Sequence, residues 1–215
     1  LRNLRYYTNR EKDCSQQIAE IEGIASHLPE ANSTNELMGM EGNVRETYYQ
    51  ALNIILELET PFERRVRQPP DNPINALISF GNSLMYTACL TEIYRTQLNP
   101  TISFLHEPGE RRFSLSLDIA EIFKPVIVDR LIFRLLNRQQ LQESKHFATE
   151  LEACYLNEAG RRIFIQAFDE QLKTTIDHRT LKRKVSYQRL IRLECYKLIK
   201  HLTGMETYQA FRAWW

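Results

Sequence analysis

Several side chains in this 215-residue sequence have the types and spacing of a divalent-metal site. Asp118 and Glu121 lie three residues apart in an apolar run, so both carboxylates fall on one side of the helix that the run predicts. His106 stands in the loop that leads into that helix. One imidazole with two or three carboxylates is an oxygen-rich ligand set that suits Mg²⁺ or Mn²⁺, and its nitrogen favours Mn²⁺.

An ordinary structural role is the alternative for the same residues. His106 would then be a hydrogen-bonded loop histidine, and the carboxylates would pair with nearby cations. Burying a carboxylate is costly unless cations or hydrogen bonds meet it. The cations close in sequence are Arg111, Arg112 and Lys124.

Glu41 is a further candidate because Gly39 and Gly42 flank it inside a helical pattern. Each glycine in a helix interior costs about 1 kcal/mol relative to alanine. Two glycines around one carboxylate therefore indicate one of two things. Either a ligand or another backbone approaches this turn closely, or the helix packs tightly against a neighbour while Glu41 is solvated nearby.

Basic residues concentrate toward the C-terminal end, although the net charge is only +1. The segment 179–200 contains eight Lys or Arg and one acid, so the rest of the chain is net acidic. Such a segment could follow a phosphate backbone, and a solvated helix face is the alternative. The triplet Arg64, Arg65 and Arg67, just before a Pro-Pro turn, is a second candidate for phosphate contact.

Other chemical motifs are weak or missing in the sequence. The four cysteines lie far apart with no C-x-x-C pair, which suits a reducing cytosol and offers no zinc site. Glu143 and His146 have the spacing of a di-iron ligand pair, but a di-iron bundle needs two such pairs. The uncharged run 72–91 is long enough to span a bilayer, yet its Asn, Ser and Pro residues favour a buried core helix.

The composition predicts an all-α, multi-helix domain. Glycine is scarce, at 7 of 215 residues, which disfavours glycine-rich phosphate loops and turn-dense β sandwiches. Apolar spacing predicts helices over about residues 4–28, 33–61, 75–98, 114–137 and 186–202. Pro125 is expected to kink the fourth of these helices or to divide it. Ser33 and Glu36 form a predicted capping box at the start of the second helix. The less periodic stretch 154–162 is expected to hold a short strand pair.

The ordered blocks 38–49, 67–86 and 104–125, with a softer match at 156–162, resemble one known family. They contain Met38-Gly-Met-Glu41-Gly, Arg67-Gln-Pro-Pro and Phe104-Leu-His106-Glu-Pro, followed by the acidic pair. The resemblance is to the CRISPR-associated spacer-acquisition integrases, the Cas-one proteins. It extends over roughly residues 1–205, and three blocks in order are more specific than any one of them.

The resemblance implies a helical C-terminal domain with one divalent metal, Mg²⁺ or Mn²⁺, held by Glu41, His106 and Glu121. Asp118 would be either a fourth acid or a partner outside the ligand set. The family also has an N-terminal β-rich domain used in dimerisation, and nothing in this sequence predicts one. We therefore expect a piece of a longer protein, with residues 1–205 as the helical domain and residues 206–215 as a tail.

The function implied by the resemblance is that of a prokaryotic, cytoplasmic, metal-dependent DNA endonuclease and integrase. Such proteins join spacer DNA 3′-OH ends to the CRISPR repeat array by transesterification, in a complex with a small partner, Cas-two; the full-length family forms homodimers. The residues expected to contact DNA are Arg45, Arg64, Arg65, Arg67, Asn75, Tyr86, Arg111, Arg112 and Lys124.

A non-catalytic DNA-binding or scaffold module that uses the basic segment 179–200 is the alternative function. Such a module would bind DNA equally well in EDTA and would never cut it. A third alternative, a metal-free helical bundle for protein partners, predicts no DNA binding.

Overall fold

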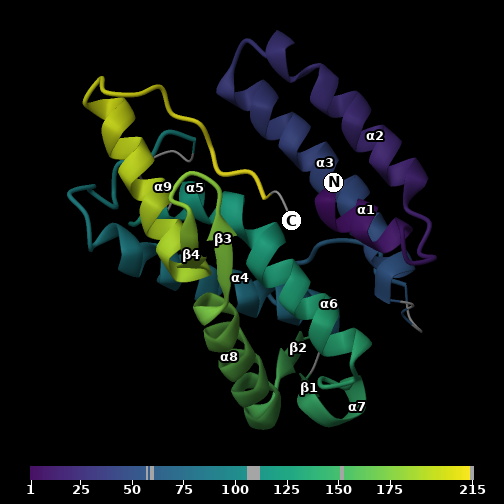
Figure 1. Cartoon of the computed structure of the whole chain (residues 1–215). Helices are drawn as coiled ribbons and strands as arrows, with labels where there is room; N and C mark the ends of the chain where they lie inside the picture. The colour runs from purple at the N-terminus through teal and green to yellow at the C-terminus, as the bar shows by residue number, and fades with distance from the viewer. Residues whose placement is uncertain (57, 59–60, 106–111, 151–152, 214–215) are drawn as a thin grey trace. The chain divides into compact units, whose positions relative to one another are not determined.

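Helices dominate the computed structural model, as the sequence predicts, and two short hairpins are the additional elements among the residues that it describes (Figure 1). The description covers the chain except residues 57, 59–60, 106–111, 151–152 and 214–215. Two compact units divide the chain, residues Leu1–Pro69 and Pro70–Trp215.

The N-terminal unit consists mainly of three helices, with a 3-10 turn (η1, Leu28–Glu30) before the third: α1 (Arg2–Thr8), α2 (Ser15–Ser26) and α3 (Thr34–Leu56). The single helix predicted over residues 4–28 is therefore divided. Glu11, between α1 and α2, has a φ of 66°, a left-handed conformation that interrupts a right-handed helix.

The start and the end of α3 are fixed by side chains. Ser33 Oγ accepts a hydrogen bond from the Glu36 backbone N at 3.2 Å, as the predicted capping box requires. The Glu36 carboxylate reaches one residue further back than that motif specifies and accepts from the Asn32 backbone N at 2.6 Å. Beyond the helix, Asn53 bonds to both the backbone N and the carbonyl of Phe62, which ties the following segment back to α3.

The C-terminal unit is built around α4 (Pro73–Ile93), which packs against α5 (Ser114–Lys124) and α9 (Tyr187–Leu202). Most of the uncharged run 72–91 is thus a core helix, as predicted. Asn72 caps it by accepting from the Asn75 backbone N at 2.9 Å. In the described part of the chain, no helix combines the length and apolar character needed to cross a membrane.

Pro125 divides the fourth predicted helix, as expected from its missing N–H. The α5 helix ends at Lys124, a π-helical turn (η2, Pro125–Asp129) follows, and α6 covers Arg130–Asn137. This break ends α5 directly after the residues predicted to do chemistry.

Two antiparallel hairpins and two further helices complete the C-terminal unit: α7 (Glu143–His146), β1 (Phe147–Glu150), β2 (Ala153–Leu156), α8 (Glu158–Lys173), β3 (Thr175–His178) and β4 (Arg183–Ser186). The strand pair expected within 154–162 was placed wrongly: it lies at 147–150 and 153–156, and α8 begins at Glu158. The sequence reasoning missed α8. The signal was there, because Asn157 caps the helix and Phe164, Ala167 and Phe168 are buried at helical spacing.

Residues after α9 return along that helix and bond to a buried carboxylate. Glu194 is 2% exposed, and it accepts from the Tyr208 hydroxyl at 2.7 Å and the Phe211 backbone N at 2.9 Å. The ring of Phe211 stacks on that of Phe123 in α5, with centroids 5.5 Å apart. Burial and the Glu194 carboxylate raise the pKa of Tyr208, so the phenol stays protonated. The predicted boundary between residues 205 and 206 stays a prediction.

We expect Tyr208→Phe to lower the free energy of unfolding by about 1–3 kcal/mol, because a buried carboxylate loses a donor. Urea denaturation measures this effect. Tyr155→Phe, which alters a half-exposed phenol, is the matched control and should change stability little. Equal stability of both variants would contradict the role of the bond to Glu194.

Candidate functional site

Asp118 lies in the first half of α5 and is buried, with 3% of the residue exposed. Its Oδ2 accepts hydrogen bonds from the backbone N of Phe104, at 2.8 Å, and of Leu105, at 3.1 Å. The carboxylate thereby holds residues 104 and 105, which directly precede His106 in the chain. Hydrogen bonds of this kind offset the cost of burying a charge.

Glu121 lies one turn further along α5 and keeps 20% of its side chain exposed. Its carboxylate pairs with Lys124 Nζ at 2.5 Å. That ammonium lies 4.6 Å from the ring centroid of Tyr86, which α4 contributes. Tyr86, Glu121 and Lys124 therefore form one cluster at the contact of α4 and α5. A carboxylate oxygen is also a ligand type that Mg²⁺ and Mn²⁺ accept.

Glu41 belongs to the N-terminal unit, in α3, and 33% of its side chain is exposed. It pairs with Arg45 one turn further along the helix. A Cβ atom added at Gly39 or Gly42 would meet no atom within 4 Å, so tight packing against a neighbouring helix of that unit is excluded as the reason for these glycines. Close approach of a ligand stays a prediction.

The other residues predicted to contact DNA have different surroundings. Arg64 and Arg67 are exposed in the N-terminal unit, and Arg65 donates to the Val66 carbonyl. Asn75 is fully buried and donates to the Asp71 carboxylate at 2.6 Å. Arg112 is exposed, with its guanidinium 5.3 Å from the Phe113 ring centroid. His106 and Arg111 lie outside the described residues.

No group of three or more His, Cys, Asp or Glu side chains suited to a metal occurs among the residues that the structure describes. His106 is not one of those residues, and Glu41 and Glu121 belong to separate units. The ligand set Glu41, His106 and Glu121 therefore stays a prediction.

The buried cysteines of the C-terminal unit are unsuited to nucleophilic chemistry. Burial raises the pKa of Cys195 to about 12, and it raises the pKa of Cys89 well above its ordinary value. Both side chains therefore remain thiols at neutral pH, whereas the thiolate is the nucleophile.

The basic segment 179–200 is divided by the structure into a hairpin part and a helical part. In α9, Arg192 pairs with Glu92 at 2.6 Å, Lys197 with Glu194 at 2.8 Å, and Lys200 with Glu206 at 2.9 Å. Of these pairs, Arg192 with Glu92 links α9 to α4, whereas the pair of Lys200 and Glu206 is exposed. The cations of the β3–β4 hairpin are exposed.

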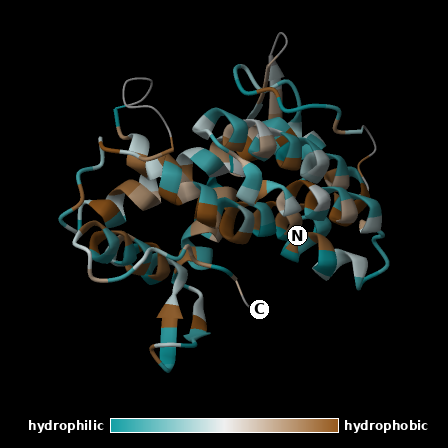
Figure 2. Ribbon diagram, turned by 90° about the horizontal axis from the view of Figure 1, so that it is seen from above, coloured by the Kyte–Doolittle hydropathy of each residue, from teal (hydrophilic) through white to brown (hydrophobic). Residues whose placement is uncertain are grey.

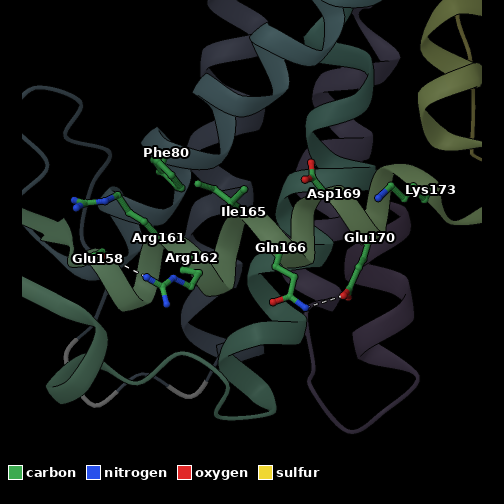
Figure 3. Close-up of a pocket in the computed structure, with 9 residues that line it drawn as sticks. All are labelled: Phe80, Glu158, Arg161, Arg162, Ile165, Gln166, Asp169, Glu170 and Lys173. Atoms are coloured by element: carbon green, nitrogen blue, oxygen red, sulfur yellow. Dashed lines mark hydrogen bonds and ion pairs between the residues drawn. The ribbon is translucent and has the colours of Figure 1, made fainter.

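A groove beside α8 is separate from the residues predicted to do chemistry (Figure 3). Its polar side chains are partly paired along the helix, Arg162 with Glu158 at 3.0 Å and Gln166 with Glu170 at 3.2 Å. The lining residues are Phe80, Glu158, Arg161, Arg162, Ile165, Gln166, Asp169, Glu170 and Lys173.

The helical fold of this chain is shared with known proteins. The family model of CRISPR associated protein Cas1 matches residues 1–170. This chain belongs to the Cas1 family. The CRISPR-associated endonuclease Cas1 of Fusobacterium nucleatum is 56% identical over 214 residues, covering 100% of this chain and 63% of that protein. The corresponding protein of Clostridium perfringens is 53% identical over 218 residues, covering 100% of this chain and 65% of that protein.

Solved structures with the same fold agree with this assignment. A Cas1 protein from Thermotoga maritima aligns with a TM-score of 0.80 and 46% identity, over 87% of this chain and 58% of that one. A casposase bound to integration product aligns with a TM-score of 0.79 and 26% identity, over 90% of this chain and 59% of that one. The chain spans 63–65% of the length of the curated relatives named above.

We expect Gly39→Ala and Gly42→Ala each to stabilise the protein by up to about 1 kcal/mol, since α3 has room for the added methyl. Denaturant unfolding measures this gain. If a ligand approaches this turn, the same variants should bind that ligand more weakly while gaining stability, and the affinity for a labelled DNA duplex checks this. Unchanged affinity in the stabilised variants would contradict a ligand-approach role for the glycines.

Asp118→Ala should lower the free energy of unfolding by about 1–3 kcal/mol in EDTA, because two backbone amides lose their acceptor at a partly buried contact. Asp118→Asn keeps an acceptor oxygen and should cost less. An Asp118→Ala protein as stable as wild type in EDTA would show that the carboxylate does not hold the 104–105 segment.

Proposed function

We propose that this chain is the catalytic helical part of a divalent-metal-dependent DNA endonuclease and integrase of CRISPR adaptation. The observation that carries the proposal is the α5 helix, where Asp118 anchors the segment before His106 and Glu121 presents a partly exposed carboxylate beside Lys124. The identity to endonucleases named Cas1 supports it, as does the fold shared with a casposase bound to integration product.

The residues proposed to hold the metal, Mg²⁺ or Mn²⁺, are Glu41, His106 and Glu121. Their chemistry fits, because two hard carboxylate oxygen donors with one imidazole suit these ions. Glu41 and Glu121 each pair with a cation and keep part of their side chains exposed, so both carboxylates are reachable from solvent. When bound, the metal would polarise the scissile phosphate and lower the pKa of a DNA 3′-OH or a water molecule.

Side chains of this chain would bind and orient the DNA strands. Lys124 is held over the Tyr86 ring and is 10% exposed, so its charge acts at a fixed place rather than in bulk solvent. Arg45, Arg64, Arg65, Arg67, Arg111 and Arg112 would contact phosphates, with Asn75 and Tyr86 near the reacting strand. Asp118 would act through the backbone of residues 104 and 105 and keep its hydrogen bonds throughout.

The reaction proposed is an in-line displacement at phosphorus. Attack by a spacer 3′-OH on a phosphodiester of the repeat gives transesterification, and attack by water gives hydrolysis. The partners proposed are spacer DNA, the CRISPR repeat, a small Cas2-type protein and a second copy of the full-length protein. A solved Cas6-RT-Cas1–Cas2 complex has the same fold over 98% of this chain, with a TM-score of 0.84 and 20% identity.

Calorimetric titration of Mn²⁺ tests the metal site. We expect one site in the wild type, and at least tenfold weaker binding in Glu41→Ala, His106→Ala and Glu121→Ala. Glu158→Ala, which breaks an exposed ion pair with Arg162 on α8, is the matched control and should bind Mn²⁺ normally. The three ligand variants should lose DNA cleavage while still unfolding cooperatively.

Wild-type affinity and turnover in Glu121→Ala would contradict the ligand assignment. DNA binding that is unchanged in EDTA, with no cleavage under any metal, would instead favour the alternative of a non-catalytic DNA-binding module.

A further inference from the structure

The β3–β4 hairpin extends away from the helices of the C-terminal unit (Figure 2). Its base is anchored by the buried Val185 and by a hydrogen bond from the Tyr187 backbone N to the Thr174 carbonyl at 3.1 Å. Four paired positions follow, from Thr175 opposite Ser186 to His178 opposite Arg183. The hairpin is therefore a defined arm rather than a loose loop.

The tip of this arm is closed by local hydrogen bonds. The Lys182 backbone N donates to the His178 carbonyl at 2.9 Å, and the Leu181 backbone N donates to His178 Nδ1 at 3.1 Å. Burial, and then the charges of Lys197 and Arg183, lower the pKa of His178, which keeps the ring neutral and able to accept. Lys182 has a φ of 51°, the left-handed conformation of a tight turn.

The arm carries an excess of positive charge. Lys182, Arg183 and Lys184 are exposed, and within the described part of the chain none of them forms an ion pair. Asp177 is the acid of the segment 175–186, and it lies opposite Lys184. With Arg179 also in the segment, the hairpin carries four cations and one anion. The α9 cations differ, because acids of the fold pair with three of them.

The chemistry of the arm suits a phosphate backbone. The segment 175–186 contains no Phe, Tyr or Trp, so it offers little for stacking on unpaired bases. Lysine and arginine on a two-stranded ribbon contact phosphates, and a ribbon of this width fits the major groove of B-form DNA. We propose that the β3–β4 hairpin is a second DNA-binding element, which contacts the phosphates of duplex DNA through Lys182, Arg183 and Lys184.

This inference rests on the proposed function only in taking DNA as the nucleic acid. It does not require that the chain be catalytic. The arm would lengthen the duplex footprint beyond the residues around α5 without reading sequence. Its contribution should therefore be electrostatic and should release counterions, about 0.9 per phosphate contacted on B-form DNA.

The test is fluorescence anisotropy of a labelled DNA duplex against the 215-residue chain, repeated over a series of salt concentrations. The combined variant Lys182→Gln, Arg183→Gln and Lys184→Gln should weaken binding tenfold or more, and it should reduce the slope of log K against log salt by up to about 2.7. The matched control, Lys145→Gln, Arg162→Gln and Lys173→Gln, removes three exposed cations elsewhere in the same unit. It should leave the slope nearly unchanged.

An equal loss of slope in both triple variants, or no loss in either, would overturn the role of the hairpin. A preference of the arm for single strands or anionic vesicles over duplex would also overturn it. A failure of the proposed function gives a different result. If the wild-type chain binds duplex DNA through the hairpin but never cleaves it with Mn²⁺, the DNA-binding role of the hairpin stands and the proposed endonuclease activity is contradicted.

Discussion

One buried carboxylate organises the candidate site of the C-terminal unit. Asp118 accepts from two consecutive backbone amides, those of Phe104 and Leu105, while it is almost fully removed from water. A buried charge persists only where donors meet it, so the helix and the segment before His106 constrain each other. Asp118 therefore has a structural role that does not depend on contact with a metal.

The rest of the C-terminal unit keeps α5 in place. The core helix α4 packs along it, α9 contacts it, and Phe211 from the C-terminal segment stacks on its Phe123. The π-helical turn that begins at Pro125 follows directly on Lys124, the last residue of α5. Within this frame Glu121 stays partly accessible beside the largely buried Lys124. A helix that presents one carboxylate next to a fixed ammonium is a suitable base for phosphodiester chemistry.

Much of the fold could be predicted from the sequence, because apolar spacing, the Ser33 cap and Pro125 act locally. The break before α2 could not, since it depends on a left-handed residue, Glu11, that carries no glycine signal. In the site, the Lys124 partner of Glu121 was foreseen as an alternative. The hydrogen-bond partners of Asp118 could not be predicted, because they are backbone amides, which every residue except proline carries. The metal ligands remain predictions, because Glu41 and Glu121 belong to different units and His106 lies outside the described residues.

The most direct measurement is anomalous diffraction at the manganese edge from crystals of the chain grown with Mn²⁺ and a DNA duplex. We expect a single strong peak in coordination contact with the Glu121 carboxylate, Glu41 and His106, while Asp118 still accepts from the amides of residues 104 and 105. A peak that is coordinated elsewhere, or an Asp118 that leaves those amides to bind the metal, would contradict the division of roles between the two acids of α5.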